Sequence, residues 1–293
     1  MTQPALSAQL HSVQSQMDTD PEGTIARLAE IGFTAVEASF MTGMPMEAMM
    51  TIRDGVAKYM PPGIELEMTM TPQASRKPLA PGELRQLLDA HGLGVSACHV
   101  YLPDGADAER IFDEQEALGN TDLVAVTGFE DFHDFDVLAR TADRYNTAAE
   151  KAKARGMRIG YHNHFTEVAP VYDGRSALEL FFDRLHPEIF AEVDIFWSFI
   201  GGRQPAELIE ALGDRVRFVH VKDGPGVFGD LSSGPGRPSM PLGRGAVDVS
   251  SVLAATDRLD YWTLELEMMG DSAFDALADS VSFVRAQDMK AQV

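Results

Sequence analysis

The chain has 293 residues, and its 24 lysines and arginines against 45 aspartates and glutamates give a formal net charge of −21 at pH 7. Apolar residues make up 45% of the sequence, so a sizeable core can be buried and global disorder is excluded. This acidity argues against nucleic acid and an anionic membrane surface as partners, because both require a cationic face.

The termini and the cysteine content narrow the class further. No apolar run approaches the ~20 residues of a membrane span, and the first residues lack the basic and apolar regions of a secretion signal. The single cysteine, Cys98, excludes an internal disulfide. We therefore expect a cytoplasmic protein.

Short apolar runs recur along the chain, and segments with helical spacing separate them. Most runs are rich in Val, Ile and Leu, as expected for parallel strands that are covered on both faces. The expected strands are, in chain order, Leu6–Ser12, Ala35–Ala38, Gly94–Val100, Leu123–Thr127, Met157–Asn163, Phe190–Ile195, Val216–Val221 and Trp262–Glu267.

The intervening segments show helix start and stop signals. Pro21–Ile31 ends at Gly32, and Pro205–Leu212 begins with a proline in its first turn and ends at Gly213. The other expected helices are Gly82–Ala90, Val137–Arg155, Ser176–Leu185, Val249–Ala255 and Phe274–Gln287.

Eight strands that alternate with helices predict a single (β/α)8 TIM barrel over residues 1–293, in the α/β class. The alternative is an open doubly wound sheet, which normally carries a glycine-rich fingerprint after its first strand. The sequence contains neither GxGxxG nor GxxxxGK[ST], which weakens that alternative. In a barrel, reactive residues are expected where each apolar run ends.

The stretch from Phe40 to Pro81 is too long for one crossover helix and holds eight of the 15 methionines. We expect an insertion after the second strand, at about residues 40–81, with an additional strand over Gly63–Met70. One interpretation is a small core that packs on a partner subunit, in a homo-oligomer. The other is a lid over the pocket, since methionine suits adaptable apolar surfaces.

The fifth expected strand ends in the segment YHNHFTE, residues 161–167. In an extended chain, His162 and His164 face the same way, and Glu167 follows closely. These side chains are candidate metal ligands or acid–base groups. The alternative is a histidine pair that caps the barrel rim through hydrogen bonds.

The sixth and seventh expected strands end in buried-looking polar residues. Asp194 has apolar neighbours on both sides, and a carboxylate there needs a cation or a hydrogen-bond network. That cation is either a metal or an arginine. His220 occupies the same position on the next strand and shares its parity with Lys222, which favours a ligand over a satisfied core histidine.

Glu265 and Glu267 alternate with leucines at the end of the eighth expected strand, so both face one side. One is expected to be a ligand and the other a supporting partner. Successive strands thus end in His/Glu, Asp, His and Glu. This donor set predicts one divalent ion such as Mn²⁺, Mg²⁺, Co²⁺ or Zn²⁺.

Over nearly the whole chain, the sequence resembles the xylose isomerase-like TIM-barrel superfamily, the sugar phosphate isomerase/epimerase group. The matching segments are Ala8–Val13, Ile31–Phe33, Val36-Glu37, His99, Tyr161–His164 with Glu167, Val193–Trp197 with Gly201-Gly202, His220–Asp223, Pro241–Gly245 with Asp248, and Leu264-Glu265.

The resemblance implies one divalent cation held by four ligands, of which Asp194, His220 and Glu265 match by position. The fourth comes from the fifth strand, where many epimerases of this group have Glu and this chain has His162. Either Glu167 reaches back to the ion, which is the assignment we favour, or His162 binds it directly. This departure puts the usual proton exchange between two glutamates in doubt.

The function implied by the resemblance is a metal-dependent isomerase or epimerase that forms an enediolate from a sugar, keto-sugar or polyol. Proton transfer is expected from Glu265, Glu167, His162 or His164, and stabilisation of the oxyanion from Lys222. The residues expected to bind substrate are His99, Trp197, Glu37 and Arg244.

Three alternatives remain. A lyase would use the same site for dehydration of a keto-inositol or for β-elimination from a 3-keto-glycoside. A non-catalytic binding protein would use only the scaffold. Related endonucleases share the barrel, but their three-zinc cluster and basic DNA track suit this acidic chain poorly.

Overall fold

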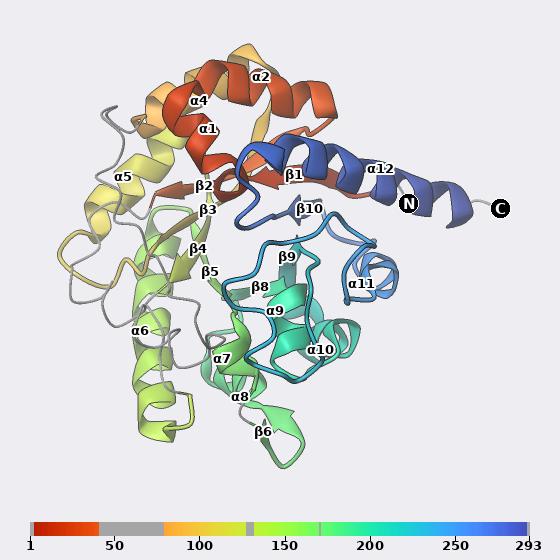
Figure 1. The fold of residues 1–293 in the computed structure, drawn as a ribbon. Coiled ribbons are helices and arrows are strands. Elements are labelled where there is room, and N and C mark those ends of the chain that lie inside the picture. Colours follow the sequence, from red (N-terminus) through yellow and green to blue (C-terminus); the bar gives the residue numbers. More distant parts are fainter. Residues whose placement is uncertain (1–2, 41–78, 127–131, 170, 292–293) are drawn as a thin grey trace.

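The computed structural model describes residues 3–40, 79–126, 132–169 and 171–291. The strands close into a parallel barrel in the spatial order β1-β10-β9-β8-β5-β4-β3-β2, and β6 and β7 form a separate antiparallel pair (Figure 1). The strands are β1 (Ala5–Gln9), β2 (Ala35–Phe40), β3 (Gly94–Tyr101), β4 (Asp122–Val126), β5 (Arg158–His162), β6 (Val171–Tyr172), β7 (Arg175–Ser176), β8 (Phe190–Asp194), β9 (Val216–Val221) and β10 (Tyr261–Leu264).

Helices surround the barrel, and the C-terminal helix packs against α2 (Figure 1). The α-helices are α1 (Gln14–Thr19), α2 (Pro21–Ile31), α4 (Pro81–Ala90), α5 (Ala108–Leu118), α6 (Phe135–Ala154), α7 (Phe165–Val168), α8 (Ala177–Arg184), α9 (Ile195–Ile200), α10 (Pro205–Leu212), α11 (Val249–Ala255) and α12 (Ala273–Ala291). The 3₁₀ turns are Leu10–Val13, Gly213–Arg215 and Gly270–Ser272. The predicted (β/α)8 TIM-barrel fold is therefore confirmed.

Local chemistry accounts for the helix boundaries. The Asp20 carboxylate accepts a hydrogen bond from the backbone N–H of Gly23 at 3.1 Å, and Pro21 occupies the first turn of α2. Gly32 ends that helix with φ of 111°, a left-handed conformation that favours glycine. All seven helices expected from the sequence are present, with small differences at their ends.

The lower part of the barrel interior is closed by apolar side chains. Ala97, Val124, Phe190 and Phe218 form a buried cluster there. A Cβ atom on Gly160 of β5 would collide with the Phe190 ring, so glycine makes room for this packing. The polar inward-facing side chains consequently lie above this cluster, toward the carboxyl ends of the strands.

Some predicted boundaries differ from the structure. The first strand ends at Gln9, because Leu10–Val13 turn into a 3₁₀ helix, and β10 ends at Leu264, one residue before Glu265. Helix α5 and the short helices α1, α7 and α9 were not expected. The predicted strand Gly63–Met70, nearly all of the predicted insertion, and Thr127 lie outside the described residues. Within the described residues, no helix is long and apolar enough to cross a membrane.

Candidate metal and active site

The inward-facing polar residues come from six barrel strands and meet near their carboxyl ends. Strand parity explains these orientations. Glu37 on β2, His99 on β3 and His220 on β9 alternate with apolar neighbours that face the helices, and His162 is the last residue of β5. All are buried. Two groups of candidate metal ligands lie among these residues, and His220 belongs to both.

The upper group consists of Asp194, His220 and Glu265, whose donor atoms lie within 4.8 Å of one another. The Nδ1 atom of His220 is 3.1 Å from Oε2 of Glu265. Asp194 Oδ1 accepts a hydrogen bond from the backbone N–H of Trp197 at 2.8 Å and so caps α9. The other oxygen, Oδ2, is buried and has no hydrogen-bond partner.

Lys222 lies beside this group and is almost fully buried. Its Nζ atom is 3.6 Å from Asp194 Oδ2, 3.3 Å from Glu265 Oε2 and 2.7 Å from Glu267 Oε1. It also lies 4.7 Å from the ring centroid of Trp197, a cation–π arrangement. Burial lowers the pKa of Lys222, but the carboxylates raise it more, so the net pKa is well above its ordinary value.

The same charges act on the carboxylates of the upper group. Burial raises the pKa of Asp194 to about 6, although Lys222 opposes this shift. Burial also raises the pKa of Glu265, but Lys222 and His220 outweigh it and hold this pKa well below its ordinary value. Glu265 is therefore a carboxylate at neutral pH, and Asp194 is the group whose charge needs further compensation.

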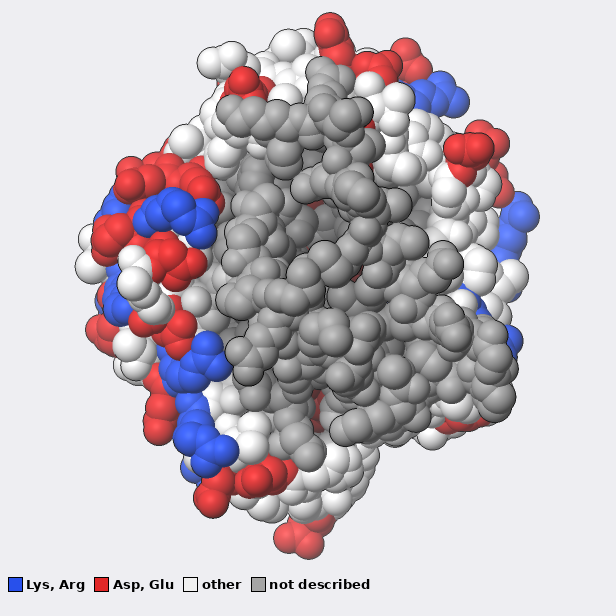
Figure 2. Space-filling view, turned by 60° about the vertical axis from the view of Figure 1, so that its left-hand side comes forward, with Lys and Arg blue, Asp and Glu red and all other residues white. Residues whose placement is uncertain are grey.

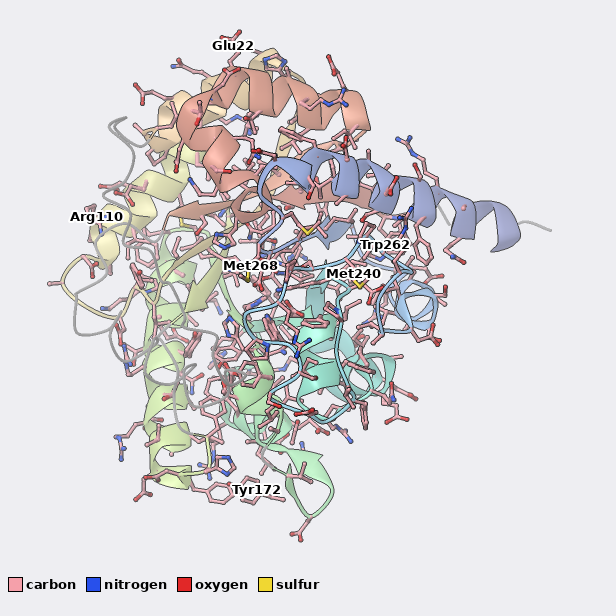
Figure 3. The ribbon with its side chains drawn as sticks, in the orientation of Figure 1. Glu22, Arg110, Tyr172, Met240, Trp262 and Met268 are labelled. Carbon is pink, nitrogen blue, oxygen red and sulfur yellow. The ribbon has the colours of Figure 1, made fainter. Side chains whose placement is uncertain are left out.

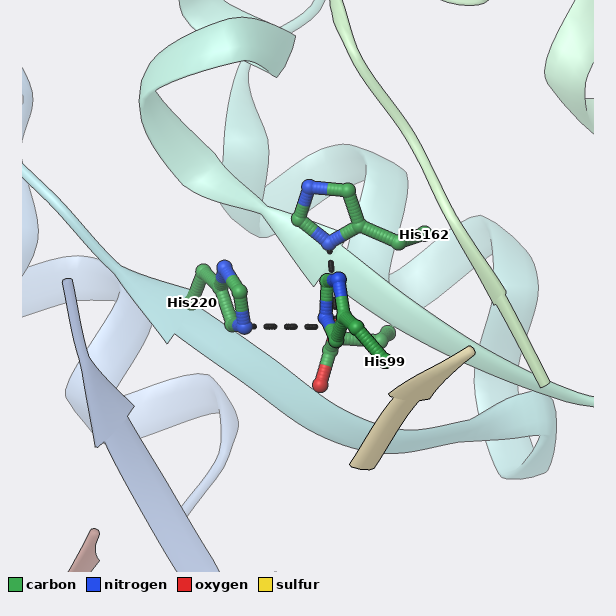
Figure 4. Close-up of side chains that lie close together, drawn as sticks. His99, His162 and His220 are labelled. Atoms are coloured by element: carbon green, nitrogen blue, oxygen red, sulfur yellow. Dashed lines mark hydrogen bonds and ion pairs between the residues drawn. The ribbon is translucent and has the colours of Figure 1, made fainter. Parts of the chain in front are cut away.

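The deeper group consists of His99, His162, Glu192 and His220. Figure 4 shows the three imidazoles gathered together. The Oε2 atom of Glu192 lies 2.8 Å from His99 Nε2, 3.0 Å from His162 Nδ1 and 3.3 Å from His220 Nε2. One carboxylate oxygen therefore faces nitrogens from three strands.

Glu37 joins the deeper group from β2. Its Oε1 atom lies 2.9 Å from His99 Nε2 and 2.8 Å from His220 Nε2, and it accepts a hydrogen bond from Gln9 Nε2 at 2.5 Å. Its Oε2 atom, like Oε1 of Glu192, is buried without a hydrogen-bond partner. The two carboxylates thus share the two imidazoles of His99 and His220.

Protonation in this cluster follows from burial and neighbouring charge. Burial lowers the pKa of His99, but Glu192 and Glu37 outweigh it and raise the pKa to about 10. Burial and the charge of Glu37 raise the pKa of Glu192 to about 7, against the effect of His220 and His99. Burial, together with His220 and His99, keeps the pKa of His162 well below its ordinary value, so this imidazole is neutral.

Glu167 lies apart from both groups. Its carboxylate accepts hydrogen bonds from the hydroxyls of Tyr161 and Thr166, both at 2.8 Å, and from the backbone N–H of His164 at 3.1 Å. His164 Nδ1 is 3.8 Å away. Of the two candidates on the fifth barrel strand, the structure therefore brings His162 together with other donors, and not Glu167.

The predicted substrate-binding residues are also separated. His99, Glu37 and Trp197 are buried at the cluster, whereas Arg244 is 65% exposed and pairs with Asp279 at 2.9 Å. Sequence reasoning missed Glu192 and the role of Gln9. Glu192 has the same parity as Asp194, two residues away, so the alternation that identified Asp194 also points to Glu192.

The loops that follow β9 and β10 border the site, and they contain Met240 and Met268 (Figure 3). Met268 is 63% exposed and has φ of 58°, a left-handed conformation that is uncommon for a non-glycine residue. It directly follows Glu267, a partner of Lys222.

Solved structures with the same fold include a sugar phosphate isomerase/epimerase from Parabacteroides distasonis, 20% identical, with a TM-score of 0.68 over 98% of this chain and 95% of that chain. A probable 3-DHS dehydratase AsbF from Bacillus anthracis is 15% identical, with a TM-score of 0.67 over 96% and 98%. A xylose isomerase-like TIM barrel protein from Mycobacterium smegmatis, in complex with magnesium, is 13% identical, with a TM-score of 0.61 over 100% and 98%.

Among curated proteins, no sequence matches this chain. A family model does match it, over residues 25–287, which is most of its length. The chain therefore belongs to the xylose isomerase-like TIM barrel family.

Proposed function

We propose that this chain is a divalent-metal-dependent isomerase or epimerase that acts on a small sugar, keto-sugar or polyol. The observation that carries the proposal is the buried Oδ2 atom of Asp194, which has no hydrogen-bond partner and belongs to the upper group with His220 Nδ1 and Glu265. One imidazole and two carboxylates fit a divalent ion such as Mn²⁺, Mg²⁺, Co²⁺ or Zn²⁺.

When bound, such an ion supplies Lewis-acid stabilisation of the enediolate that forms when a C–H proton leaves the substrate. Glu265 is held as a carboxylate by Lys222 and His220, which is the form that accepts a proton. The Lys222 ammonium donates a hydrogen bond to Glu265 Oε2 in the upper group and is suited to a developing oxyanion. The buried ring of Trp197 gives the site an apolar wall for the sugar face.

This proposal gives different roles to three residues at the end of β5. They are His162, His164 and Glu167. His162 is neutral and buried, which suits a proton acceptor. His164 is more accessible, and its ring lies 5.1 Å from that of His162, between centroids. Glu167 positions the backbone of His164 and the Tyr161 hydroxyl through its hydrogen bonds, so we assign it a positioning role.

A lyase is the second candidate, and the adjacent pair His162 and His164 favours it. Loss of a leaving oxygen requires a proton donor near the enolate, and a partly exposed imidazole next to a buried one supplies such a group. The similar fold of the probable dehydratase from B. anthracis is consistent with this chemistry. Dehydration of a keto-inositol or β-elimination from a 3-keto-glycoside would share the enolate and differ in the next step.

The Asp194→Asn variant tests both metal binding and turnover. It keeps the side-chain oxygen that caps α9 but removes the carboxylate charge. We expect metal affinity at the upper group to fall by at least about 100-fold and deuterium exchange to be lost. Exchange is followed by NMR in D₂O with a panel of free and phosphorylated ketoses, inososes and 3-keto-glycosides. Asp279→Asn, an exposed carboxylate, is the control. Full exchange by metal-free Asp194→Asn protein would overturn the proposal.

The same spectra separate the two candidate reactions. An isomerase or epimerase conserves substrate mass apart from deuterium, whereas a lyase releases water or an aglycone. A protein that binds a ketose without any exchange would be a binding protein on the barrel scaffold. The cytoplasmic location and homo-oligomer stay predictions, which fractionation and light scattering test.

A further inference from the structure

The deeper group differs from the upper group in its donor chemistry. Its four donor atoms are His99 Nε2, His162 Nδ1, Glu192 Oε2 and His220 Nε2, which lie within 4.8 Å of one another. All four side chains are buried, and they come from β3, β5, β8 and β9. Three imidazoles and one carboxylate suit zinc and related transition metals better than magnesium.

Hydrogen bonds alone leave this group incompletely satisfied. Three nitrogens converge on Glu192 Oε2, while its Oε1 atom and Oε2 of neighbouring Glu37 are buried without hydrogen-bond partners. Buried carboxylate oxygens of this kind are costly unless a cation compensates them. In each of these carboxylates the hydrogen-bond partners lie on one oxygen, so the cluster has buried acceptor oxygens to spare.

The spacing fits a small cation. Tetrahedral ligands at about 2.0–2.1 Å from zinc are separated by roughly 3.3–3.5 Å from one another. The nitrogens lie 2.8, 3.0 and 3.3 Å from Glu192 Oε2, at or somewhat below these separations, and all four donor atoms lie within 4.8 Å of one another.

We propose that His99, His162, Glu192 and His220 form a second divalent-cation site of zinc-preferring type, below Asp194 and Glu265. His220 offers Nε2 to this site and Nδ1 to the upper group, so its ring connects the two. Each of the two sites would therefore use a different nitrogen of this ring, and metal binding would compete with protonation of that nitrogen. The proposal does not depend on the proposed function, because the ligands of the deeper group do not include Asp194 or Glu265.

The rival explanation is a hydrogen-bonded cluster of imidazoles and carboxylates that holds no ion. The two explanations differ in metal content, which mass spectrometry measures on the full chain after removal of metal, loading with Zn²⁺ and desalting. We expect roughly two zinc ions per wild-type chain, and roughly one in Glu192→Gln and His162→Asn. His186→Gln, at an exposed histidine ahead of β8, is the control and keeps the wild-type content.

Asp194→Asn separates this proposal from the proposed function, because it removes a ligand of the upper group alone. We expect this variant to retain roughly one zinc ion, and X-ray absorption at the zinc edge to show scattering from about three imidazoles. If Asp194→Asn loses no metal while Glu192→Gln does, the upper site fails and the deeper site stands.

The proposal is overturned if wild type binds no ion, if Glu192→Gln leaves the content unchanged, or if the ion in Asp194→Asn has an oxygen-dominated shell. Should Glu192→Gln fail to fold, the absorption spectra of wild type and Asp194→Asn still decide between the two explanations.

Discussion

Lys222 is a buried ammonium that forms ion pairs with Asp194, Glu265 and Glu267. Its positive charge and their negative charges compensate one another. Removing one partner of a buried charge group is far more damaging than its net contribution, because the remaining charges stay desolvated. In Lys222→Met, three carboxylates lose their cation. We expect the free energy of unfolding of the metal-free protein to fall by about 3–5 kcal/mol, measured by urea denaturation.

Added Mn²⁺ should restore part of that stability, because an ion at the upper group supplies positive charge to the same carboxylates. Lys153→Met is the matched control: its ammonium is exposed and pairs with Glu188, so we expect no measurable change. Equal destabilisation of both variants would contradict this account of Lys222.

Glu167 gives a second test at the residue scale, since sequence reasoning favoured it as a ligand and the structure surrounds it with hydrogen-bond donors. We expect Glu167→Gln to leave the metal content unchanged and to cost about 1–3 kcal/mol of stability, because one of its acceptor oxygens becomes a donor. Metal analysis and denaturation of the same sample measure both. Loss of one bound ion would restore Glu167 to the ligand set.

At the scale of elements, periodicity in the sequence predicted the strands and the longer helices, and the strand-end rule predicted Asp194, His220 and Glu265. Parity tells which face a side chain takes, but it does not tell how deep along the barrel axis it lies. Glu192 and Asp194 share a face, yet they belong to different groups of ligands. That distinction depends on the register between β8 and β9, which pairs Asp194 with His220.

The position of Glu167 could not be predicted for a related reason. The chain turns into α7 at Phe165, so Glu167 stands on a helical turn and its carboxylate accepts the His164 N–H. Nothing in the segment HNHFTE distinguishes this turn from a continued strand by periodicity, since four residues are too few. Helix α5 was missed although Ile111, Gln115 and Leu118 show helical spacing.

The loop between β9 and α11 is organised by one carboxylate. Asp223 accepts hydrogen bonds from four backbone N–H groups, those of Gly224, Gly243, Gly245 and Val247, at 2.9–3.1 Å. The loop directly follows His220 on β9 and Lys222 just beyond it. We expect Asp223→Ala to lower the free energy of unfolding by at least about 1–3 kcal/mol and to expose the loop to proteolysis.

Asp230→Ala is the control in the same loop. The Asp230 carboxylate is exposed, and the hydrogen bonds it accepts in this structure come from nearby Ser232. We expect no measurable change in stability. Unchanged proteolysis of Asp223→Ala would show that the loop keeps its conformation without this carboxylate.

For the whole molecule, the excess of acidic residues and the buried cluster act over different pH ranges. Acidic side chains predominate among the charged ones on the visible rim of Figure 2, in line with the net charge of −21. Such exposed carboxylates are already ionised at pH 7. A change of stability between pH 7 and 10 therefore reports mainly on buried groups.

His99 and His220 are the buried imidazoles of the cluster whose pKa is raised, and His99 gives the clearer test. Its pKa is raised to about 10 in the folded protein against 6.5 for the free side chain, so its contribution to stability is complete below pH 6.5 and is lost as pH rises through 10. The pKa of Glu192 is raised to about 7, so its contribution to stability is also lost as pH rises, but at a lower pH than that of His99. We expect the melting temperature of the metal-free protein to fall steadily from pH 7 to 10.

The His99→Gln variant tests whether deprotonation of His99 causes this loss of stability. It removes the titrating imidazole, while the glutamine amide still offers a hydrogen bond to Glu192 or Glu37. The variant should be less stable than wild type at pH 7 and should show a flatter profile up to pH 10. Divalent cation bound by the cluster should flatten the wild-type profile as well, since the ion replaces the protons that compensate the carboxylates. A metal-free wild type with a level profile, or a variant with the same slope, would mean that His99 is neutral in the folded protein and that the two carboxylates are compensated in another way.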